Sequence, residues 1–274
     1  MNELIICPAY NEQVEMQNTI DSILKYYNGQ IVIVDDGSTD NTINCISNDL
    51  RINVINHKKR RGYGAAIKSG FKYAINEGFK KILTFDSDGQ HDACFIRQMF
   101  DELEQNDFVN GTRFSNFSRK DSDIPKKRLE ANLFFNFIIQ KILNLNISDV
   151  FSGMKAYNVK LIKNFQLKEN GYGFPIEVLF NLKVSRAKII EVPINLTYLD
   201  QEKNFNNDFK DDIELMNYLI NLISTNINEF KDGLNSNIST NLKEIINIGF
   251  SYCQTEEIFK TKPYLKIFNN SKLF

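Results

Sequence analysis

The first half of the chain alternates short apolar runs with stretches of helical spacing. The apolar runs end at proline, acidic or turn-forming residues, and they span residues 4–7, 31–34, 54–55 and 82–85. Short runs rich in β-branched residues are typical of buried parallel strands. In the stretches between them, apolar residues recur at every third or fourth position, which predicts a helix in each. These stretches span residues 16–27, 67–75 and 95–103.

Strands that alternate with helices predict βαβ units. We therefore expect an α/β fold whose mostly parallel sheet has helices on both faces. The second half is less regular. Its apolar spacing predicts helices over 126–145, 177–184 and 213–227, and residues 189–194 are predicted to form an edge strand because Pro193 has no N–H to donate to a further strand.

The composition beyond residue 230 changes the picture of the domain organisation. The tail is rich in Asn, Ser and Lys and has only a short helical stretch at 242–248. No internal repeat is evident at the periods of solenoid proteins. We therefore expect one domain over residues 1–230, followed by a C-terminal extension over residues 231–274.

Composition and charge exclude several classes of protein. The 274 residues are 42% hydrophobic and 24% charged, and 33 Lys and Arg against 34 Asp and Glu give a net charge of −1. This balance argues against a nucleic-acid-binding protein. No stretch reaches the roughly 18 uncharged apolar residues of a membrane span, and the N-terminus has no signal-peptide pattern. We expect a cytoplasmic protein with free thiols, and peripheral contact with the cytoplasmic face of the membrane stays open.

Polar segments follow three of the predicted strands directly. They span residues 8–12, 35–40 and 86–92. Ligands of open parallel sheets bind at the carboxyl ends of the strands, so these segments should converge on one cleft. In the first segment, Tyr10 and Glu12 are placed to wrap a nucleobase. The alternative for that segment is a plain turn between a strand and a helix.

Asp86 and Asp88 carry the sharpest chemical signal. Residues i and i+2 at the end of an extended strand point the same way, and two carboxylates on one side repel each other unless a cation lies between them. Mg²⁺ and Mn²⁺ prefer such oxygen ligands. Gln90 continues the spacing with a neutral oxygen, so Asp86, Asp88 and Gln90 are the predicted metal ligands. The alternative is an Asp-rich turn held by side-chain to backbone hydrogen bonds.

The second polar segment offers contacts for a nucleoside. Asp36 and the hydroxyls of Ser38 and Thr39 fit the ribose or the base of such a ligand. The same segment can also form a turn that leads into a helix predicted over 42–50, with Asp40 as its N-cap. The two interpretations are compatible, because the cap and the ligand contacts use different residues.

A basic run at residues 58–61 precedes a glycine-started helix. Such an arrangement can cradle a diphosphate, although the first two lysines are better interpreted as a solvated loop. Gly62 and Gly64 match part of a dinucleotide-binding fingerprint. Ile67 occupies the position of the third glycine, and the segment follows the third strand rather than the first, which argues against a Rossmann dehydrogenase.

These motifs together resemble a known family, the nucleotide-sugar-dependent glycosyltransferases of family 2, which have the GT-A fold. The resemblance is most specific for the branch that acts on polyprenyl phosphates, typified by dolichyl-phosphate mannose synthase. It is strong to about residue 115, moderate to about residue 195 and absent beyond. The motifs that carry it are Cys-Pro-Ala-Tyr-Asn-Glu from Cys7, Val-Asp-Asp-Gly-Ser-Thr-Asp from Val34, Gly-Tyr-Gly-Ala-Ala from Gly62, Asp-Ser-Asp-Gly-Gln-His-Asp from Asp86, Gly-Thr-Arg-Phe from Gly111 and Glu-Val-Pro-Ile from Glu191.

The resemblance implies a role for each matched position. Asp86, Ser87 and Asp88 would straddle the ribose and the metal, with help from Gln90. Arg113 would meet the donor phosphates or the acceptor. The positions that would hold the nucleoside are Pro8, Tyr10, Glu12, Val34 and Asp36.

One departure from the family pattern concerns the donor. The branch places an Arg and then a Ser-Lys pair shortly after Glu-Val-Pro-Ile, where they clamp the diphosphate. Residues 197–205 of this chain contain no Arg, and Lys203 is the nearest cation. The departure leaves the identities of donor and acceptor open, and it motivates one alternative, a nucleotide-sugar-binding protein without turnover.

The mechanism implied by the resemblance is a direct displacement that inverts the anomeric centre. The predicted catalytic residues are Asp88, Arg113 and Glu177. A metal and Arg113 would offset the charge on the leaving nucleoside diphosphate. A sugar hydroxyl as acceptor would need a base, for which Glu177 is the candidate, whereas a lipid phosphate already carries a negative charge. Glu177 can instead be an ordinary surface residue of its helix.

The acceptor predicted from the resemblance is a polyprenyl phosphate, with a glycan hydroxyl as the alternative. Residues 126–143 combine a basic start at 126–128 with an apolar stretch. This combination suits peripheral contact with an anionic membrane. A core helix or a homodimer interface would explain the same pattern.

Overall fold

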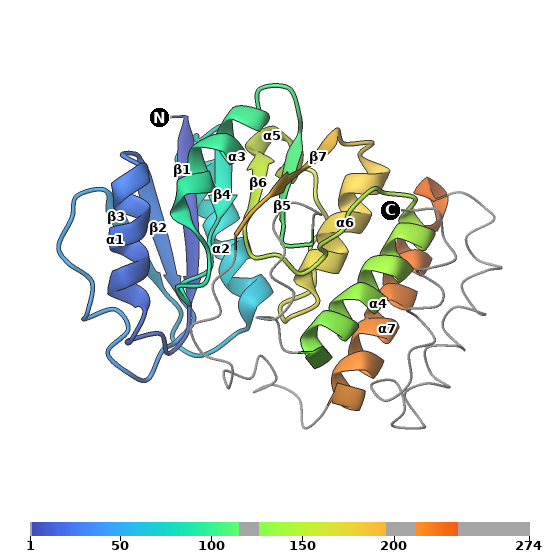
Figure 1. Ribbon diagram of the computed structural model, residues 1–274, viewed down its shortest axis with the longest axis horizontal. Coiled ribbons are helices and arrows are strands. Elements are labelled where there is room, and N and C mark those ends of the chain that lie inside the picture. The colour runs from blue at the N-terminus through green and yellow to red at the C-terminus, as the bar shows by residue number, and fades with distance from the viewer. Residues whose placement is uncertain (1, 115–125, 196–211, 235–274) are drawn as a thin grey trace. The chain divides into compact units, whose positions relative to one another are not determined.

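The computed structural model describes residues 2–114, 126–195 and 212–234, and within them it contains a seven-stranded sheet (Figure 1). The strands are β1 (Glu3–Ala9), β2 (Gln30–Asp35), β3 (Ile52–Asn56), β4 (Lys81–Thr84), β5 (Phe108–Thr112), β6 (Lys155–Asn158) and β7 (Ile189–Pro193). Their order is β3-β2-β1-β4-β6-β5-β7. β6 is antiparallel to β4 and β5, and the other neighbouring pairs are parallel. The predicted mostly parallel α/β sheet is confirmed.

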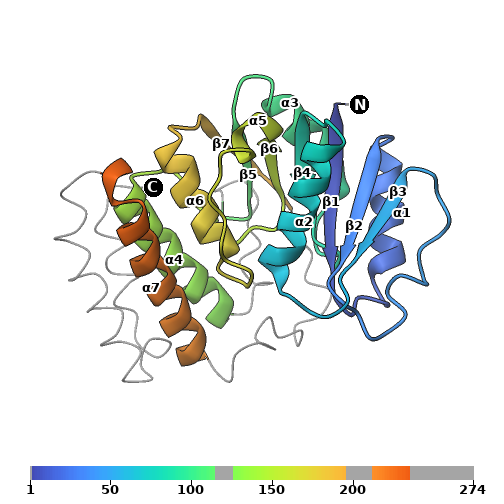
Figure 2. The same cartoon turned by 180° about the vertical axis from the view of Figure 1, so that it is seen from behind.

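Helices cover both faces of this sheet. α1 (Met16–Tyr26) and α3 (Ile96–Glu102), which follows the short η1 (Ala93–Phe95), lie on one face (Figure 1). α2 (Tyr63–Asn76), α5 (Val159–Ile162) and α6 (Phe174–Val184) lie on the other (Figure 2). The helices predicted over 16–27, 67–75, 95–103 and 177–184 are present, and the one predicted over 42–50 is not.

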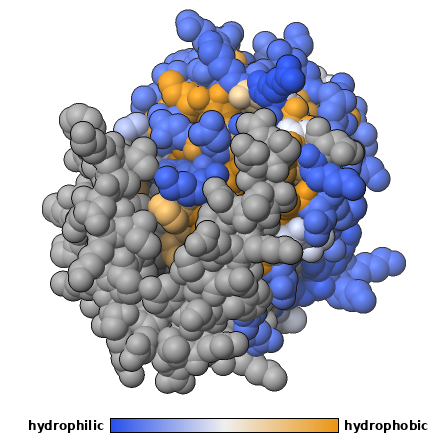
Figure 3. All heavy atoms as spheres, turned by 90° about the vertical axis from the view of Figure 1, so that its right-hand side faces the viewer, coloured by the Kyte–Doolittle hydropathy of each residue, from blue (hydrophilic) through white to orange (hydrophobic). Residues whose placement is uncertain are grey.

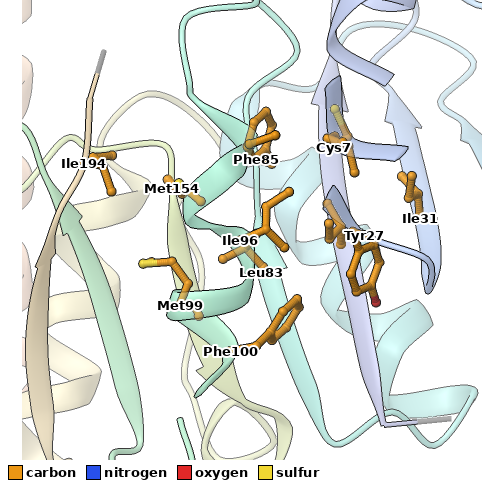
Figure 4. Close-up of a cluster of buried hydrophobic side chains, with 14 of the residues drawn as sticks. Cys7, Tyr27, Ile31, Leu83, Phe85, Ile96, Met99, Phe100, Met154 and Ile194 are labelled. Atoms are coloured by element: carbon orange, nitrogen blue, oxygen red, sulfur yellow. The ribbon is translucent and has the colours of Figure 1, made fainter. Parts of the chain in front are cut away.

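The core on the α1 face is built from the alternating apolar residues of the strands. Leu83 and Phe85 pack there with Met99 and Phe100 of α3, and all four are fully buried (Figure 4). On the other face, the Phe71 ring of α2 lies 5.2 Å from the Tyr157 ring. These two layers fix the ends of the central strands, where the polar segments begin.

Three features of the fold differ from the sequence-based expectation. Residues 42–50 form turns rather than a helix, although Asp40 does accept a hydrogen bond from the Thr42 amide at 2.9 Å. No strand was expected at the positions of β5 and β6. Both strands are only four or five residues long and carry polar residues, so their two-residue period is too short to stand out.

The chain divides into two compact units. The first comprises Met1–Asp123 and Ile147–Leu199 and holds the whole sheet, and the second comprises Ile124–Asn146 and Asp200–Phe274. This division differs from a single boundary at residue 230. The extension over 231–274 lies almost wholly beyond the described ranges and stays a prediction.

The described elements of the second unit are α4 (Lys126–Leu143), α7 (Asp212–Glu229) and η3 (Lys231–Gly233). The two long helices lie side by side (Figures 1 and 2), and they correspond to the helices predicted over 126–145 and 213–227. Five apolar residues of α4 are buried, namely Phe135, Ile138, Ile139, Ile142 and Leu143. Burial of this face fits the core-helix alternative, and the side chains of residues 126–128 lie outside the described part.

The helices also bear on the membrane prediction. Of those that the structure describes, none combines the length and the apolar character that crossing a bilayer requires. On the face in Figure 3, hydrophobic side chains lie next to hydrophilic ones. Membrane contact through residues 126–143 and homodimer formation stay predictions.

Candidate active site

The three polar segments meet at the carboxyl edge of the sheet, as predicted. The first and second are joined by the Asn11 amide, which donates to Ser38 Oγ at 3.0 Å, and by the Asp36 amide, which donates to the Ala9 carbonyl at 2.8 Å. The first and third are joined by Ser87 Oγ, which donates to the Pro8 carbonyl at 2.8 Å. These contacts place the acidic residues of the second and third segments around the carboxyl end of β1.

The Asp86 carboxylate is held against protein on several sides. Its Oδ2 lies 3.7 Å from His91 Nε2. Burial, together with the nearby charge of Asp86, raises the pKa of the Tyr63 hydroxyl. A Cβ at position 153 would lie 1.8 Å from Oδ2, so only glycine fits beside this carboxylate. The other oxygen, Oδ1, is buried and has no hydrogen-bond partner among the described residues. A buried, unpartnered carboxylate oxygen is costly in an apo protein and is ready to bind a cation.

Asp88 and Gln90 form the turn that follows. The Gln90 amide donates to Asp88 Oδ1 at 3.0 Å, and Gly89 between them has a φ of +73°. The Asp-rich turn and the predicted metal site are therefore both compatible with the geometry. Within the described ranges, no three His, Cys, Asp or Glu side chains gather into a ready-made metal site. A site of two carboxylates and an amide fits Mg²⁺ or Mn²⁺, since these ions complete their coordination with water and substrate phosphates.

The carboxylate of Asp36 binds other groups of the chain, which its motif did not indicate. One carboxylate oxygen lies 2.6 Å from His57 Nδ1, and the other accepts the Gly62 amide at 2.6 Å. The Arg61 amide donates to both oxygens at 3.0 Å. The residue is only 3% exposed. Asp36 therefore anchors the basic loop to the sheet, and whether it also contacts a nucleoside stays a prediction.

This arrangement changes the interpretation of the basic run. The Arg61 and Gly62 amides at the start of α2 donate to Asp36, so they are not presented to a diphosphate. The predicted backbone cradle is thus wrong for these two amides, because a carboxylate of the chain itself occupies them. Lys58 and Lys59 are exposed, as predicted for a solvated loop.

The remaining residues predicted to hold the nucleoside differ in what they can offer. Tyr10 is half-buried, and the Arg60 guanidinium lies 4.3 Å from the centre of its ring. Glu12 donates its amide to Thr42 Oγ1 at 2.8 Å. Val34 is fully buried in β2, and Ser87 uses its hydroxyl on the Pro8 carbonyl. Tyr10 and Arg60 therefore form the aromatic and cationic surface of this loop cluster.

Arg113 follows β5 and is clamped by one carboxylate. Its Nε and Nη2 donate to Asp149 at 2.6 and 2.7 Å, and its amide donates to the same carboxylate at 3.0 Å. Asp149 is fully buried, and the Arg113 side chain is 12% exposed. Such bidentate, charge-assisted pairs fix a guanidinium in one orientation. The structure identifies Asp149 as the partner of Arg113.

Glu177 is buried and bound to the loop that precedes α6. It lies in the first turn of α6 and is 2% exposed. Its two oxygens accept the amides of Lys168 and Glu169 at 2.8 and 2.9 Å. Burial raises the pKa of this carboxyl. The carboxylate therefore holds the loop before α6 in place. The alternative of an ordinary surface residue is wrong, and the role of Glu177 as catalytic base stays a prediction.

A buried cation near the site was missed by sequence reasoning. Lys155 opens β6 and is 3% exposed, and its ammonium donates to the Ser152 carbonyl. Burial lowers the pKa of Lys155 to about 8, while the charges of Asp149 and Asp86 act in the opposite direction. A single lysine in a short strand gives no sequence signal. Lys203, the nearest cation after β7, lies beyond the part of the chain that the structure describes.

The sequence of the chain is similar to those of known proteins. The family model for "Glycosyl transferase family 2" matches residues 4–165. A UDP-N-acetylglucosamine–dolichyl-phosphate N-acetylglucosaminyltransferase of Methanococcus voltae is 28% identical over 216 residues, which cover 72% of this chain and 86% of the relative. An undecaprenyl-phosphate mannosyltransferase of Micrococcus luteus is 25% identical over 210 residues, covering 74% and 85%.

The fold is also found among solved structures. Glucosyl-3-phosphoglycerate synthase from Mycobacterium tuberculosis, in complex with Mn²⁺, uridine diphosphate and phosphoglyceric acid, superposes with a TM-score of 0.58. The sequence identity is 16%, and the match covers 84% of this chain and 78% of that one, so it supports the fold alone. The sheet order, the acidic loops at its carboxyl edge and the family match lead to one conclusion: the chain is a GT-A-fold glycosyltransferase that belongs to glycosyltransferase family 2.

Proposed function

We propose that this glycosyltransferase moves a sugar from a nucleoside diphosphate sugar to a polyprenyl phosphate, with inversion of the anomeric centre. The two relatives described above carry names that specify polyprenyl-type phosphate acceptors. The loops of β1, β2 and β4 meet at one edge, where a nucleoside diphosphate would bind. The N-terminal residues of the site, Tyr10 and Asp36, would face the nucleoside.

The metal of this reaction would be held by Asp86 and Asp88, with the amide oxygen of Gln90. The unpartnered Oδ1 of Asp86 is the observation that supports a cation there. When bound, Mg²⁺ or Mn²⁺ offsets the negative charge that develops on the leaving diphosphate. The residues of the chain supply orientation: Gly153 and His91 fix the Asp86 carboxylate, and the 148–153 loop connects it to the Arg113 pair.

The hydrogen bonds of Glu177 favour a phosphate acceptor over a sugar hydroxyl. A sugar hydroxyl needs a base within hydrogen-bond reach, and the predicted base is committed to two backbone amides. A phosphate monoester is already ionised near neutral pH and attacks without one. An ionised acceptor also suits Arg113, which the Asp149 carboxylate holds in one orientation and which can bind a phosphate.

The proposed function is tested by transfer of a radiolabelled sugar. The enzyme is incubated with Mn²⁺, labelled UDP-N-acetylglucosamine, UDP-glucose or GDP-mannose, and undecaprenyl phosphate. We expect label in the organic phase with one donor and none after Asp88→Ala. The alternative acceptor class is tested in parallel with soluble oligosaccharides, where label in an aqueous oligosaccharide product would contradict the proposal.

A second outcome separates turnover from binding. A nucleotide-sugar-binding protein would bind one of these donors but release no nucleoside diphosphate and label no acceptor. Asp21→Ala provides a matched charge control for Asp88→Ala, because Asp21 is an exposed aspartate of α1 outside the proposed site. This variant should transfer sugar as the wild type does.

A further inference from the structure

The carboxylate of Glu191 is the common partner of two elements beneath Arg113. It lies in β7, which pairs in parallel with β5, and Asn110 is its partner in the register. Asn110 Nδ2 donates to Oε1 at 2.8 Å. The Ser148 amide donates to both oxygens at 3.0 Å, and Ser148 Oγ donates to Oε2 at 2.7 Å. Glu191 therefore binds the first residues of the 148–153 loop to the sheet.

The next residue of that loop is the clamp of Arg113. Asp149 follows Ser148 directly, and its own carbonyl accepts from Asn110 Nδ2 at 2.9 Å. Asn110 thus donates to Glu191 and to Asp149 with one amide group. The Asp149 carboxylate receives three hydrogen bonds from Arg113. The orientation of the guanidinium is consequently set by a chain of contacts that begins at Glu191.

A role in joining β5 to β7 does not account for this arrangement. The backbones of β5 and β7 pair in register from Phe108 to Thr112, so the strands are joined without the side chain of Glu191. Burial raises the pKa of Glu191 and thus disfavours its charged form. A partly buried carboxylate that gathers four donor contacts is instead suited to fix a loop that would otherwise have unpaired polar groups.

We propose that Glu191 is a positioning residue of the transfer reaction, which acts through Ser148 and Asp149 to hold Arg113 in the orientation that binds a phosphate. The inference rests on the proposed function for the identity of that phosphate. Its geometric part, the orientation of Arg113 by Glu191, is independent of which substrate is used. The two parts need separate readouts.

The first readout is the NMR signal of the Arg113 Nε–H group. Arginine side chains are labelled with ¹⁵N, and the signal is assigned by its loss in Arg113→Lys. In the wild type, the hydrogen bond to Asp149 should shift the proton downfield and slow its exchange. We expect Glu191→Ala to abolish both effects, and Glu191→Gln to keep them in part because the amide retains one acceptor. An unchanged signal in a folded Glu191→Ala protein would overturn the inference.

The second readout is a double-mutant cycle on the KM for farnesyl phosphate, a soluble short-chain acceptor. Loss of orientation should raise this KM about tenfold in Glu191→Ala, within the range of one charge-assisted hydrogen bond, with a smaller change in kcat. In an Arg113→Ala background, the same change should have less than about a twofold effect. Equal effects of Glu191→Ala with and without Arg113 would overturn the inference, since the residue would then act by another route.

Controls separate this inference from the proposed function. Glu104 is an exposed glutamate, with a side chain that is 71% exposed, and Glu104→Ala should leave both readouts unchanged. If the wild type transfers no sugar to farnesyl phosphate or to undecaprenyl phosphate, the proposed function fails. The NMR readout then still decides whether Glu191 orients Arg113. If transfer occurs and the signal does not respond to Glu191→Ala, the inference alone fails.

Discussion

Gly153→Ala is a single-methyl test of the Asp86 site. The added Cβ would lie 1.8 Å from Asp86 Oδ2, 2.3 Å from Cγ and 2.7 Å from Oδ1, whereas ordinary contacts begin at 3.4 Å. Relief of the clash requires the carboxylate to move by about 1.5 Å if the backbone stays in place. The carboxylate cannot simply turn away, because His91 Nε2 lies 3.7 Å from Oδ2.

The expected magnitudes follow from that displacement. A shift of about 1 Å in a reacting group can cost about 100-fold in rate, and disturbed support of a metal ligand lowers metal affinity about 10–100-fold. We therefore expect Gly153→Ala to weaken Mn²⁺-dependent binding of a nucleoside diphosphate at least about tenfold. Overpacking should also cost about 1–3 kcal/mol of unfolding free energy.

Isothermal titration of UDP and GDP with Mn²⁺ measures the effect below the melting temperature. Gly78→Ala is the matched control, because Gly78 has a φ of +77° and no atom lies within 4 Å of the place that a Cβ would take there. It should cost about 1–2 kcal/mol through backbone strain and leave the affinity unchanged. Wild-type affinity in a folded Gly153→Ala protein would refute the assignment of Asp86 to the binding site.

Three further substitutions test other parts of the account. Asp36→Asn should lower the unfolding free energy by about 2–3 kcal/mol even without ligand, because the Arg61 and Gly62 amides lose a charged acceptor. Thermal unfolding measures this change, and an unchanged melting temperature would contradict the anchoring role of Asp36. Glu177→Gln should lower stability but reduce kcat less than about tenfold, whereas loss of a true base costs about 100-fold or more. The pKa of Lys155 is about 8 in the folded protein and 10.5 ordinarily. Between these pH values the unfolded chain binds more protons, so the stability of the wild type should rise with pH relative to that of Lys155→Met. Melting curves in EDTA from about pH 7 to 10 measure this, and a reverse trend or none would contradict the burial of the ammonium.

Strong local patterns made parts of the fold and site predictable from the sequence. β1, β2 and β4 contain uninterrupted apolar runs, so their burial and their parallel pairing could be inferred from the chain. β3 is polar at every third position and lies at the edge of the sheet, so it is only partly buried, unlike the buried strand expected there. The convergence of the three polar segments followed from topology alone. Asp86 and Asp88 were singled out as candidate metal ligands because two carboxylates at strand spacing are unusual without a cation.

The parts that could not be predicted depend on contacts between distant segments. Asp149 lies 36 positions from Arg113, and Glu191 lies 43 positions from Ser148. The hydrophobic periodicity of a sequence does not predict contacts between residues so far apart in the chain. The burial of Glu177 was not foreseen for the same reason, because its partners are the amides of a loop that the pattern did not resolve. Nothing in the local pattern indicated that Asp36 would use its oxygens on the chain itself.

The central claim is that the acidic loops at the carboxyl edge form a metal-dependent donor site. Its most direct test is the binding of UDP and GDP to the full chain, with Mn²⁺ and with EDTA, in the wild type and in Asp88→Ala. The account predicts that one nucleotide binds and raises the melting temperature only when Mn²⁺ is present, and that Asp88→Ala abolishes this binding. Binding that is equally tight in EDTA, or that survives Asp88→Ala, would contradict it.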